Sequence, residues 1–180
     1  MARDRQPVLK RCRNLGLDPI VLGVNKKSNR NIRPNANRKL TEYGTQQREK
    51  QKVKFVYGVM EKQFYKLYEE ATRKEGVTGE LLLQYLERRL DNVIYRLGFG
   101  TTRRQARHIV SHGHVLINGK RVNIASYRVK QGDVISLKEN SRELAIIKEA
   151  VGQKAVPGWL SLDEGTLTAK VLERSEEHTS

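Results

Sequence analysis

Cysteine and long hydrophobic runs are nearly absent from this chain. Cys12 is the only cysteine among 180 residues, which excludes an internal disulfide and any zinc site built from several cysteines of this chain. No stretch approaches the roughly 18 apolar residues of a membrane span. The opening Met-Ala-Arg-Asp-Arg also lacks the apolar core of a secretory signal. We therefore expect a cytoplasmic protein that does not enter a membrane.

Apolar and acidic residues are scarce as well. With 37% hydrophobic residues, the chain can form one or two small domains but buries less apolar surface than an average chain of its length. It contains 20 acidic residues against 35 Lys and Arg, so its formal net charge is +15. Such an excess of positive charge indicates a polyanionic partner.

The positive charge is concentrated in two segments. Residues 1–54 contain 15 basic and 4 acidic residues, and residues 86–139 contain 11 and 4. Residues 1–44 show little helical or strand periodicity, which predicts an extended basic N-terminal arm. On charge alone, this arm either binds phosphate or only keeps the chain soluble.

Helical periodicity follows, over residues 45–88. Apolar residues spaced by three, four and seven predict one helix that Gly76 ends, and Thr78 is a candidate cap of a leucine-rich second helix. Aromatic residues on these helices either pack in a core or stack on bases. The apolar residues of the first helix are Val53, Val56, Val59, Met60, Phe64, Leu67 and Ala71.

Two short helices are predicted next. Gly98 can end the first through a left-handed cap, and Thr101 or Thr102 can begin the second, which runs to about Ser111. The outer face of the second helix is expected to be cationic and to attract phosphate near the helix N-terminus; a merely solvated face is the alternative. Its basic residues are Arg103, Arg104, Arg107 and His108.

A hairpin is predicted at Asn118-Gly119, because both central residues of a type I′ turn need positive φ. Lys120 and Arg121 lie beside its tip. A turn at residues 131–133 leads into an alternating strand at 134–137, which can pair in the same small sheet. The fold class is therefore α+β.

Neither a metal site nor a nucleotide cradle is favoured. His108, His112 and His114 have no acidic residue or cysteine nearby in the sequence to complete a metal cluster. Residues 113–120 resemble a phosphate loop only superficially, since five residues separate the glycines where that motif has four, and the following Ser or Thr is missing. We expect no cofactor.

Three segments resemble the S-four RNA-binding domain, namely Leu86 to Gly98, Thr102 to Arg107 and Val115 to Lys120. That domain also occurs in rRNA pseudouridine synthases, tyrosyl-tRNA synthetases and a small heat-shock RNA binder. Upstream segments resemble the bacterial small-subunit ribosomal protein S-four family itself. These are Leu40 to Gly44, Arg48 to Val53, Tyr57 to Val59 and Gly76 to Glu80, and the resemblance extends from Met1 to about Leu172.

This resemblance implies a structural ribosomal protein that binds the 5′ domain of 16S rRNA early, nucleates small-subunit assembly and supports translational accuracy beside protein S-five. It also raises the protein's own mRNA as a partner. The implied architecture is a mainly helical domain at 45–88, to which residues 150–173 return, with an inserted S-four module at 89–149, two short helices packed on a small, mostly antiparallel sheet. The candidate RNA-binding residues are Arg48, Lys50, Lys52, Lys54, Arg103, Arg104, Arg107, His108, Lys120 and Arg121.

The chain departs from the family pattern at two places. Many relatives hold zinc through an N-terminal cysteine cluster, whereas Cys12 stands alone here, so the chain resembles the zinc-free form. Residues 174–180 read like a translated sequencing adapter, and we expect an artefactual tail on a C-terminally truncated chain.

The alternative functions are a free-standing RNA binder and the RNA handle of an rRNA-modifying enzyme. An enzyme needs a second, sizeable catalytic domain. Residues 1–85 read as a basic arm with helices, and residues 150–180 are too few to form one. A free-standing RNA chaperone would not need the segment from Tyr43 to Val53. We therefore expect no enzymatic activity.

Overall fold

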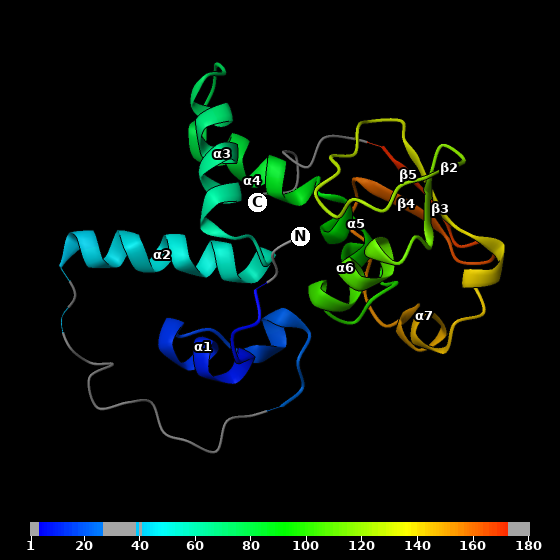
Figure 1. The fold of residues 1–180 in the computed structure, drawn as a ribbon, viewed down its shortest axis with the longest axis horizontal. Coiled ribbons are helices and arrows are strands. Elements are labelled where there is room, and N and C mark those ends of the chain that lie inside the picture. Colours follow the sequence, from blue (N-terminus) through cyan, green and yellow to red (C-terminus); the bar gives the residue numbers. More distant parts are fainter. Residues whose placement is uncertain (1–3, 27–38, 40, 173–180) are drawn as a thin grey trace. The chain divides into compact units, whose positions relative to one another are not determined.

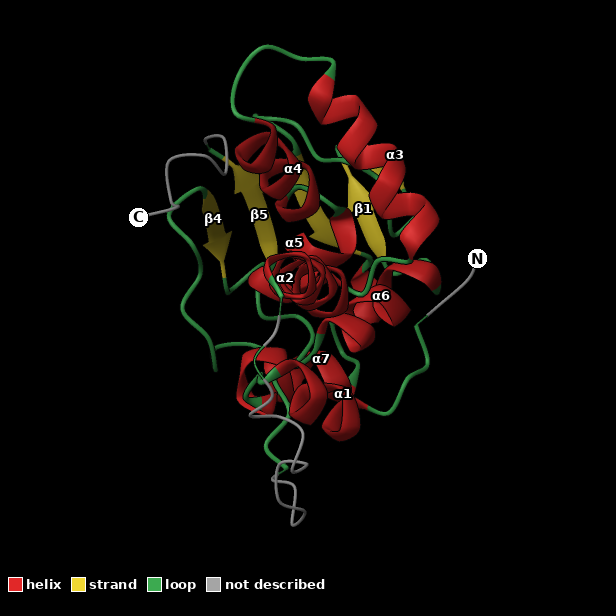
Figure 2. Cartoon of the chain, turned by 90° about the vertical axis from the view of Figure 1, so that its left-hand side faces the viewer, coloured by secondary structure: helices red, strands yellow, loops and turns green. Residues whose placement is uncertain are grey.

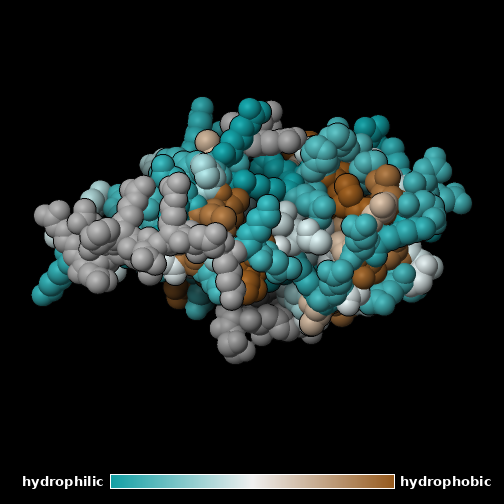
Figure 3. Space-filling model, turned by 90° about the horizontal axis from the view of Figure 1, so that it is seen from below, coloured by the Kyte–Doolittle hydropathy of each residue, from teal (hydrophilic) through white to brown (hydrophobic). Residues whose placement is uncertain are grey.

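The structure, a computed structural model, describes residues 4–26, 39 and 41–172 (Figure 1). It contains two compact units, Met1–Lys66 and Leu67–Ser180. Two expected segments lie outside the described residues, namely residues 27–38 and 40 of the arm and the artefactual tail at 174–180. No helix in the described ranges is long and apolar enough to cross a membrane. On the face shown in Figure 3, hydrophilic residues separate the hydrophobic patches.

The first unit begins with a helix, α1, at Val8–Leu15, followed by a short 3-10 helix at Pro19–Leu22. Cys12 and Leu15 are buried against Phe55. The expectation of an extended arm is therefore wrong for residues 8–22. Their apolar side chains are few, and they form a core only because Phe55, far along the chain, completes it.

The long helix expected before Gly76 is in fact two helices, α2 at Glu42–Tyr57 and α3 at Glu61–Thr72. Thr41 caps α2 by accepting a hydrogen bond from the Gly44 N–H. Gly58 ends it with a left-handed φ of 66°. The predicted apolar stripe is buried at Phe55, Val59, Phe64 and Ala71, but it continues across the break.

The second unit contains α4 at Thr78–Glu87, α5 at Leu90–Arg96, α6 at Arg103–Ser111 and α7 at Ala145–Ala150. Val77, not Thr78, occupies the N-cap position of α4. Gly98 has the expected positive φ after α5, and Thr102 caps α6 as predicted. In Figures 1 and 2, α5 and α6 lie against one face of the sheet, with which they share the main hydrophobic core.

The sheet has five antiparallel strands in the order β2-β1-β3-β5-β4, which confirms the α+β class. The predicted hairpin is confirmed, with φ of 51° at Asn118 and 81° at Gly119. The strands are β1 Val115–Ile117, β2 Lys120–Arg121, β3 Val134–Leu137, β4 Leu160–Asp163 and β5 Thr168–Val171.

Residues 150–172 contribute two strands to the sheet of the second unit. Strand β5 pairs with β3, with Ile135 opposite Ala169, and Trp159 is buried in the same core as the sheet. These C-terminal residues thus enlarge the module instead of leaving it. Two strands of four residues have too short an alternating pattern to reveal their partner in the sequence.

Candidate nucleic-acid interface

Helix α6 holds four of the ten candidate residues, and the structure divides them between two environments. Arg104 and His108 are exposed. Arg103 and Arg107 are buried, with 9% and 8% of their surface exposed. The prediction that both arginines lie on the outer face is wrong, because their spacing of four puts them on the inward side with Ala106 and Val110.

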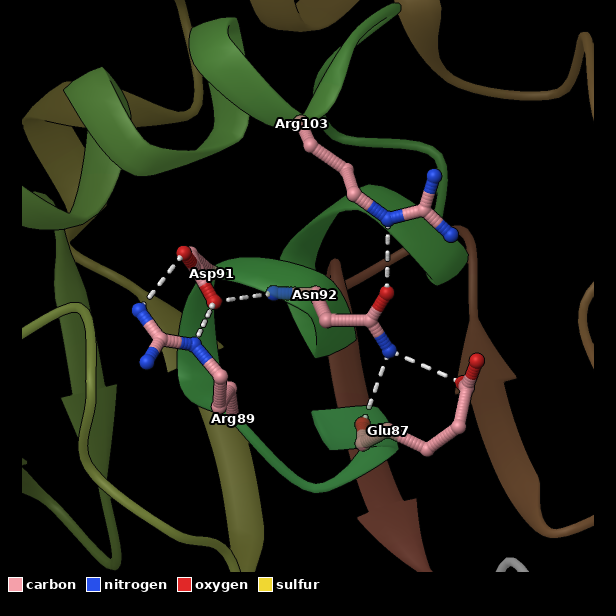
Figure 4. Close-up of polar contacts among 5 residues, drawn as sticks. All are labelled: Glu87, Arg89, Asp91, Asn92 and Arg103. Atoms are coloured by element: carbon pink, nitrogen blue, oxygen red, sulfur yellow. Dashed lines mark hydrogen bonds and ion pairs between the residues drawn. The ribbon is translucent and has the colours of Figure 1, made fainter. Parts of the chain in front are cut away.

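Arg103 connects α6 to α5 (Figure 4). Its Nε donates a hydrogen bond to Asn92 Oδ1 at 2.9 Å. Its guanidinium lies 4.4 Å from the centre of the Tyr95 ring, a cation–π distance. Arg103 therefore fixes the position of α6, and this explains why a cation is buried there.

Asn92 stands at the centre of a buried polar network in the same view. Its Nδ2 donates to the Glu87 backbone oxygen at 2.8 Å and to Glu87 Oε2 at 2.9 Å. Its backbone N–H donates to Asp91 Oδ1 at 2.8 Å, and Asp91 also pairs with Arg89. Buried polar groups that find partners in this way fix one arrangement of the backbone.

The exposed face of α6 meets the hairpin through Arg121. A Cβ built on Gly113 would lie 2.4 Å from Arg121 Nε, so the guanidinium rests directly on the glycine backbone. Gly113 has a φ of 76°, which also favours glycine. Arg121 is thereby held at the C-terminal end of α6, whereas Lys120 stays exposed on β2.

Three histidines line the same region. The ring centres of His108 and His112 are 3.9 Å apart, and those of His112 and His114 are 6.4 Å apart. Lys138 joins them, because its backbone N–H donates to the His114 carbonyl where β1 pairs with β3. We call these five residues the basic cluster: His108, His112, His114, Arg121 and Lys138.

His114, the most enclosed histidine of the basic cluster, binds a proton less tightly than a free histidine does. The pKa of His114 is lowered from 6.5, first by burial and then by the charges of His112, Lys138, His108 and Arg121. The His114 Nδ1 lies 2.7 Å from Ser141 Oγ. Within the described ranges, no ion pair joins these five residues to a carboxylate. The cluster is thus a ready site for an external anion.

The candidate residues of α2 have carboxylate or backbone neighbours. Glu61 accepts from both Lys50, at 2.7 Å, and Lys54, and these two lysines lower its pKa to about 2. Lys52 pairs with Glu49 at 3.1 Å. Arg48 lies against the backbone of Gly16: a Cβ added to this glycine would be 3.1 Å from Arg48 Nη2.

Nothing in the described part of the chain resembles a metal centre or an activated thiol. No group of three His, Cys, Asp or Glu side chains there is arranged to hold a metal ion. Burial, with a contribution from Asp18, raises the pKa of the Cys12 thiol. The thiol is thereby kept in its less reactive protonated form.

Two family models together match residues 3–135 of the chain. The model described as "Ribosomal protein S4/S9 N-terminal domain" matches residues 3–87, and that described as "S4 domain" matches residues 88–135. The "Small ribosomal subunit protein uS4" of Fusobacterium nucleatum subsp. nucleatum is 66% identical over 173 residues, covering 96% of this chain and 89% of that protein. The chain belongs to the uS4 family.

Other uS4 proteins give the same result. That of Lachnoclostridium phytofermentans is 56% identical over 96% of this chain and 89% of the relative, and that of Aquifex aeolicus is 56% identical over 77% and 68%. This uS4-family chain is accordingly a protein of the small ribosomal subunit and not an enzyme. The basic cluster lies largely within the S4 match. From the sequence, His112 and His114 were expected to cap, pack or touch RNA, and Lys138 was not among the candidates.

Gly113 offers a test of the joint between α6 and the hairpin. Gly113→Ala should displace the Arg121 guanidinium and weaken RNA binding several-fold, because the added Cβ occupies its position. Both this variant and Gly132→Ala should lose about 1–2 kcal/mol of stability from left-handed strain. Gly132 has a φ of 89° but no neighbour within 4 Å, so it is a matched control. Equal RNA affinity of the two variants would contradict this role of Arg121.

The lowered pKa of His114 predicts a loss of stability in mild acid. The unfolded chain binds a proton near pH 6.5, whereas the folded chain resists it, so stability is present above that pH and falls as the pH drops toward the folded-state pKa. Urea unfolding at about pH 7.5 and 5.5 should show this loss in the wild type and a smaller one in His114→Gln. An unchanged difference in His114→Gln would assign the effect to other groups.

Proposed function

We propose that this uS4-family chain is a primary 16S rRNA-binding protein that nucleates small-subunit assembly and supports translational accuracy. The observation that carries the proposal is the basic cluster, in which Arg121 of β2 and Lys138, just after β3, join the histidines in and after α6. Arg121 and Lys138 supply the positive charge, and the histidine rings supply further hydrogen-bonding groups, a combination that suits the phosphate backbone of a folded RNA.

The rigid support of the cluster favours recognition of RNA shape. Arg103 and Asn92 hold α6 against α5, so the exposed Arg104 and His108 keep a fixed spacing. Structured RNA is recognised largely through its backbone geometry, since side chains cannot read its deep, narrow major groove. Cations at fixed positions select an RNA whose phosphates match them.

Residues 1–88 supply a second region for the same RNA. Their first 54 residues carry 15 basic side chains. On α2, Lys52 pairs with the exposed Glu49, and an exposed ion pair contributes only about 0–1 kcal/mol, so an RNA phosphate can replace this carboxylate at little cost. Lys50 and Lys54 keep their pairing with Glu61 and add positive charge to the same helix. We assign Arg48 to the same region, and Lys120 to the hairpin side of the S4 domain.

The family resemblance extends the proposal to particular partners. These are the 5′ domain of 16S rRNA, the neighbouring ribosomal protein S-five and the protein's own mRNA. The place of action would be the cytoplasm, within the small subunit. The domain proposal keeps residues 89–149 as the RNA-binding module, supported by the match to an S4 domain over residues 88–135.

Sedimentation and filter binding test the proposal together. The tagged chain should migrate with small subunits at moderate salt and bind a 16S 5′-domain transcript more tightly than an unrelated transcript of equal length. The logarithm of the affinity should fall steeply with the logarithm of the salt concentration, because binding releases counterions from RNA. Recovery only in the free fraction, with no preference between the transcripts, would refute the assignment.

A further inference from the structure

The first unit contains a hollow of about 360 Å³, separate from the basic cluster of the S4 domain. It lies between the residues that precede α1 and the junction of α2 with α3. Phe55, Val59 and Met60 form its apolar wall, and Arg5, Arg11 and Gln51 are among its polar lining. Its volume is at the small end of the range found for ligand sites, which suits a single compact group.

Arg11 brings a guanidinium charge to the lining of this hollow. Its Nε is buried and has no hydrogen-bond partner among the described residues. Its guanidinium carbon lies 5.8 Å from the centre of the Phe55 ring, so the cation is retained beside an aromatic face. Protein atoms enclose this Nε, so a ligand in the hollow would meet the positive charge of the guanidinium and not this donor.

The remaining lining specifies the chemistry of that ligand. Met60 has 39% of its surface exposed and offers an apolar contact for a flat ring. The Gln51 amide can donate and accept hydrogen bonds at the edge of such a ring. The exposed Arg5 can neutralise an anion at the rim. Two carboxylates also belong to the lining: Glu61 is paired with Lys50 and Lys54, and Asp4 accepts a hydrogen bond from the Gln6 backbone N–H.

We propose that this hollow binds one unstacked nucleotide of the RNA, with its base on the apolar wall and its phosphate at Arg5 and Arg11. The inference rests on the proposed rRNA binding and adds a base-level contact to it. Selective RNA-binding proteins commonly take bases that are splayed out of a helix, and they combine an apolar platform with hydrogen bonds to the base edge.

Filling the hollow tests this assignment without removing charge. Met60→Trp should weaken binding of the 16S 5′-domain transcript about tenfold, the loss expected for one base contact, and leave the salt slope unchanged. Val77→Trp is the matched control, because Val77 is 63% exposed and lies outside the lining. Thermal unfolding checks that both variants fold, and Gln51→Ala provides a second variant with a smaller side chain.

Crosslinking identifies the occupant directly. With 4-thiouridine in the transcript, mass spectrometry should find a crosslinked nucleotide on the peptide spanning residues 55–60, and Met60→Trp should abolish it. Wild-type binding with no such crosslink, and full affinity in Met60→Trp and Gln51→Ala, would overturn the nucleotide site while leaving rRNA binding intact. If free nucleoside monophosphates saturate the hollow and bound transcript does not keep them out, RNA is not the source of the nucleotide.

Discussion

Replacing Asn92 with alanine is expected to lower the free energy of unfolding by about 3–4 kcal/mol. The side chain is 1% exposed and joins Arg103 to Glu87 through three hydrogen bonds. Its removal leaves the Arg103 guanidinium and the Glu87 carboxylate without this shared partner in a largely buried site. Urea unfolding of the full chain, followed by circular dichroism, measures the loss.

Arg96→Ala is the control for this prediction. Arg96 donates to the same Glu87 carboxylate at 3.0 Å, but 36% of its side chain is exposed. Water can replace a half-exposed ion pair, so the expected loss is within about 1 kcal/mol. Similar losses in the two variants would show that the buried hydrogen bonds of Asn92 stabilise the fold no more than the half-exposed Arg96–Glu87 ion pair does.

The second large effect concerns RNA affinity. The double variant Arg104→Ala, Arg121→Ala should bind the 16S 5′-domain transcript roughly fifty-fold more weakly near 0.1 M salt and reduce the logarithmic salt slope by nearly two units. Both residues are exposed, and Arg121 lies against the end of α6. Filter binding over a series of salt concentrations measures both quantities.

The matched control is the double variant Lys130→Ala, Lys148→Ala. It removes the same charge from exposed positions outside the basic cluster, and Lys148 already pairs with Glu143. We expect little change in slope. Because Arg103 is buried, Arg103→Ala should lower the free energy of unfolding and leave the salt slope almost unchanged, contrary to the expectation from the sequence. Equal slopes for the two double variants would remove Arg104 and Arg121 from the interface.

The sequence was sufficient to predict the elements that are determined by contacts between neighbouring residues. The hairpin follows from Asn118-Gly119, whose positive φ values few other pairs adopt. Thr102 begins α6 because its side-chain oxygen accepts from the Gln105 N–H, three residues on. In each case the interacting atoms belong to neighbouring residues, so no knowledge of the tertiary fold was needed.

Features that depend on distant residues could not be predicted in this way. Arg103 and Arg107 looked exposed because arginine is rarely buried, and only Tyr95 and Asn92 on α5 explain why Arg103 turns inward. Lys138 reaches the basic cluster through strand pairing, 24 positions beyond His114. The break between α2 and α3 could have been predicted, because Gly58 interrupts the periodic pattern.

The strand order also determines when the sheet can be completed during synthesis. Strand β5, at residues 168–171, lies between β3 and β4, so one edge of β3 stays open until nearly all of the described chain has left the ribosome that makes it. An open strand edge can pair with other chains. The helix pair α5–α6 and the hairpin can form earlier from local contacts, but a nascent chain released before residue 168 would expose β3 and be prone to aggregate.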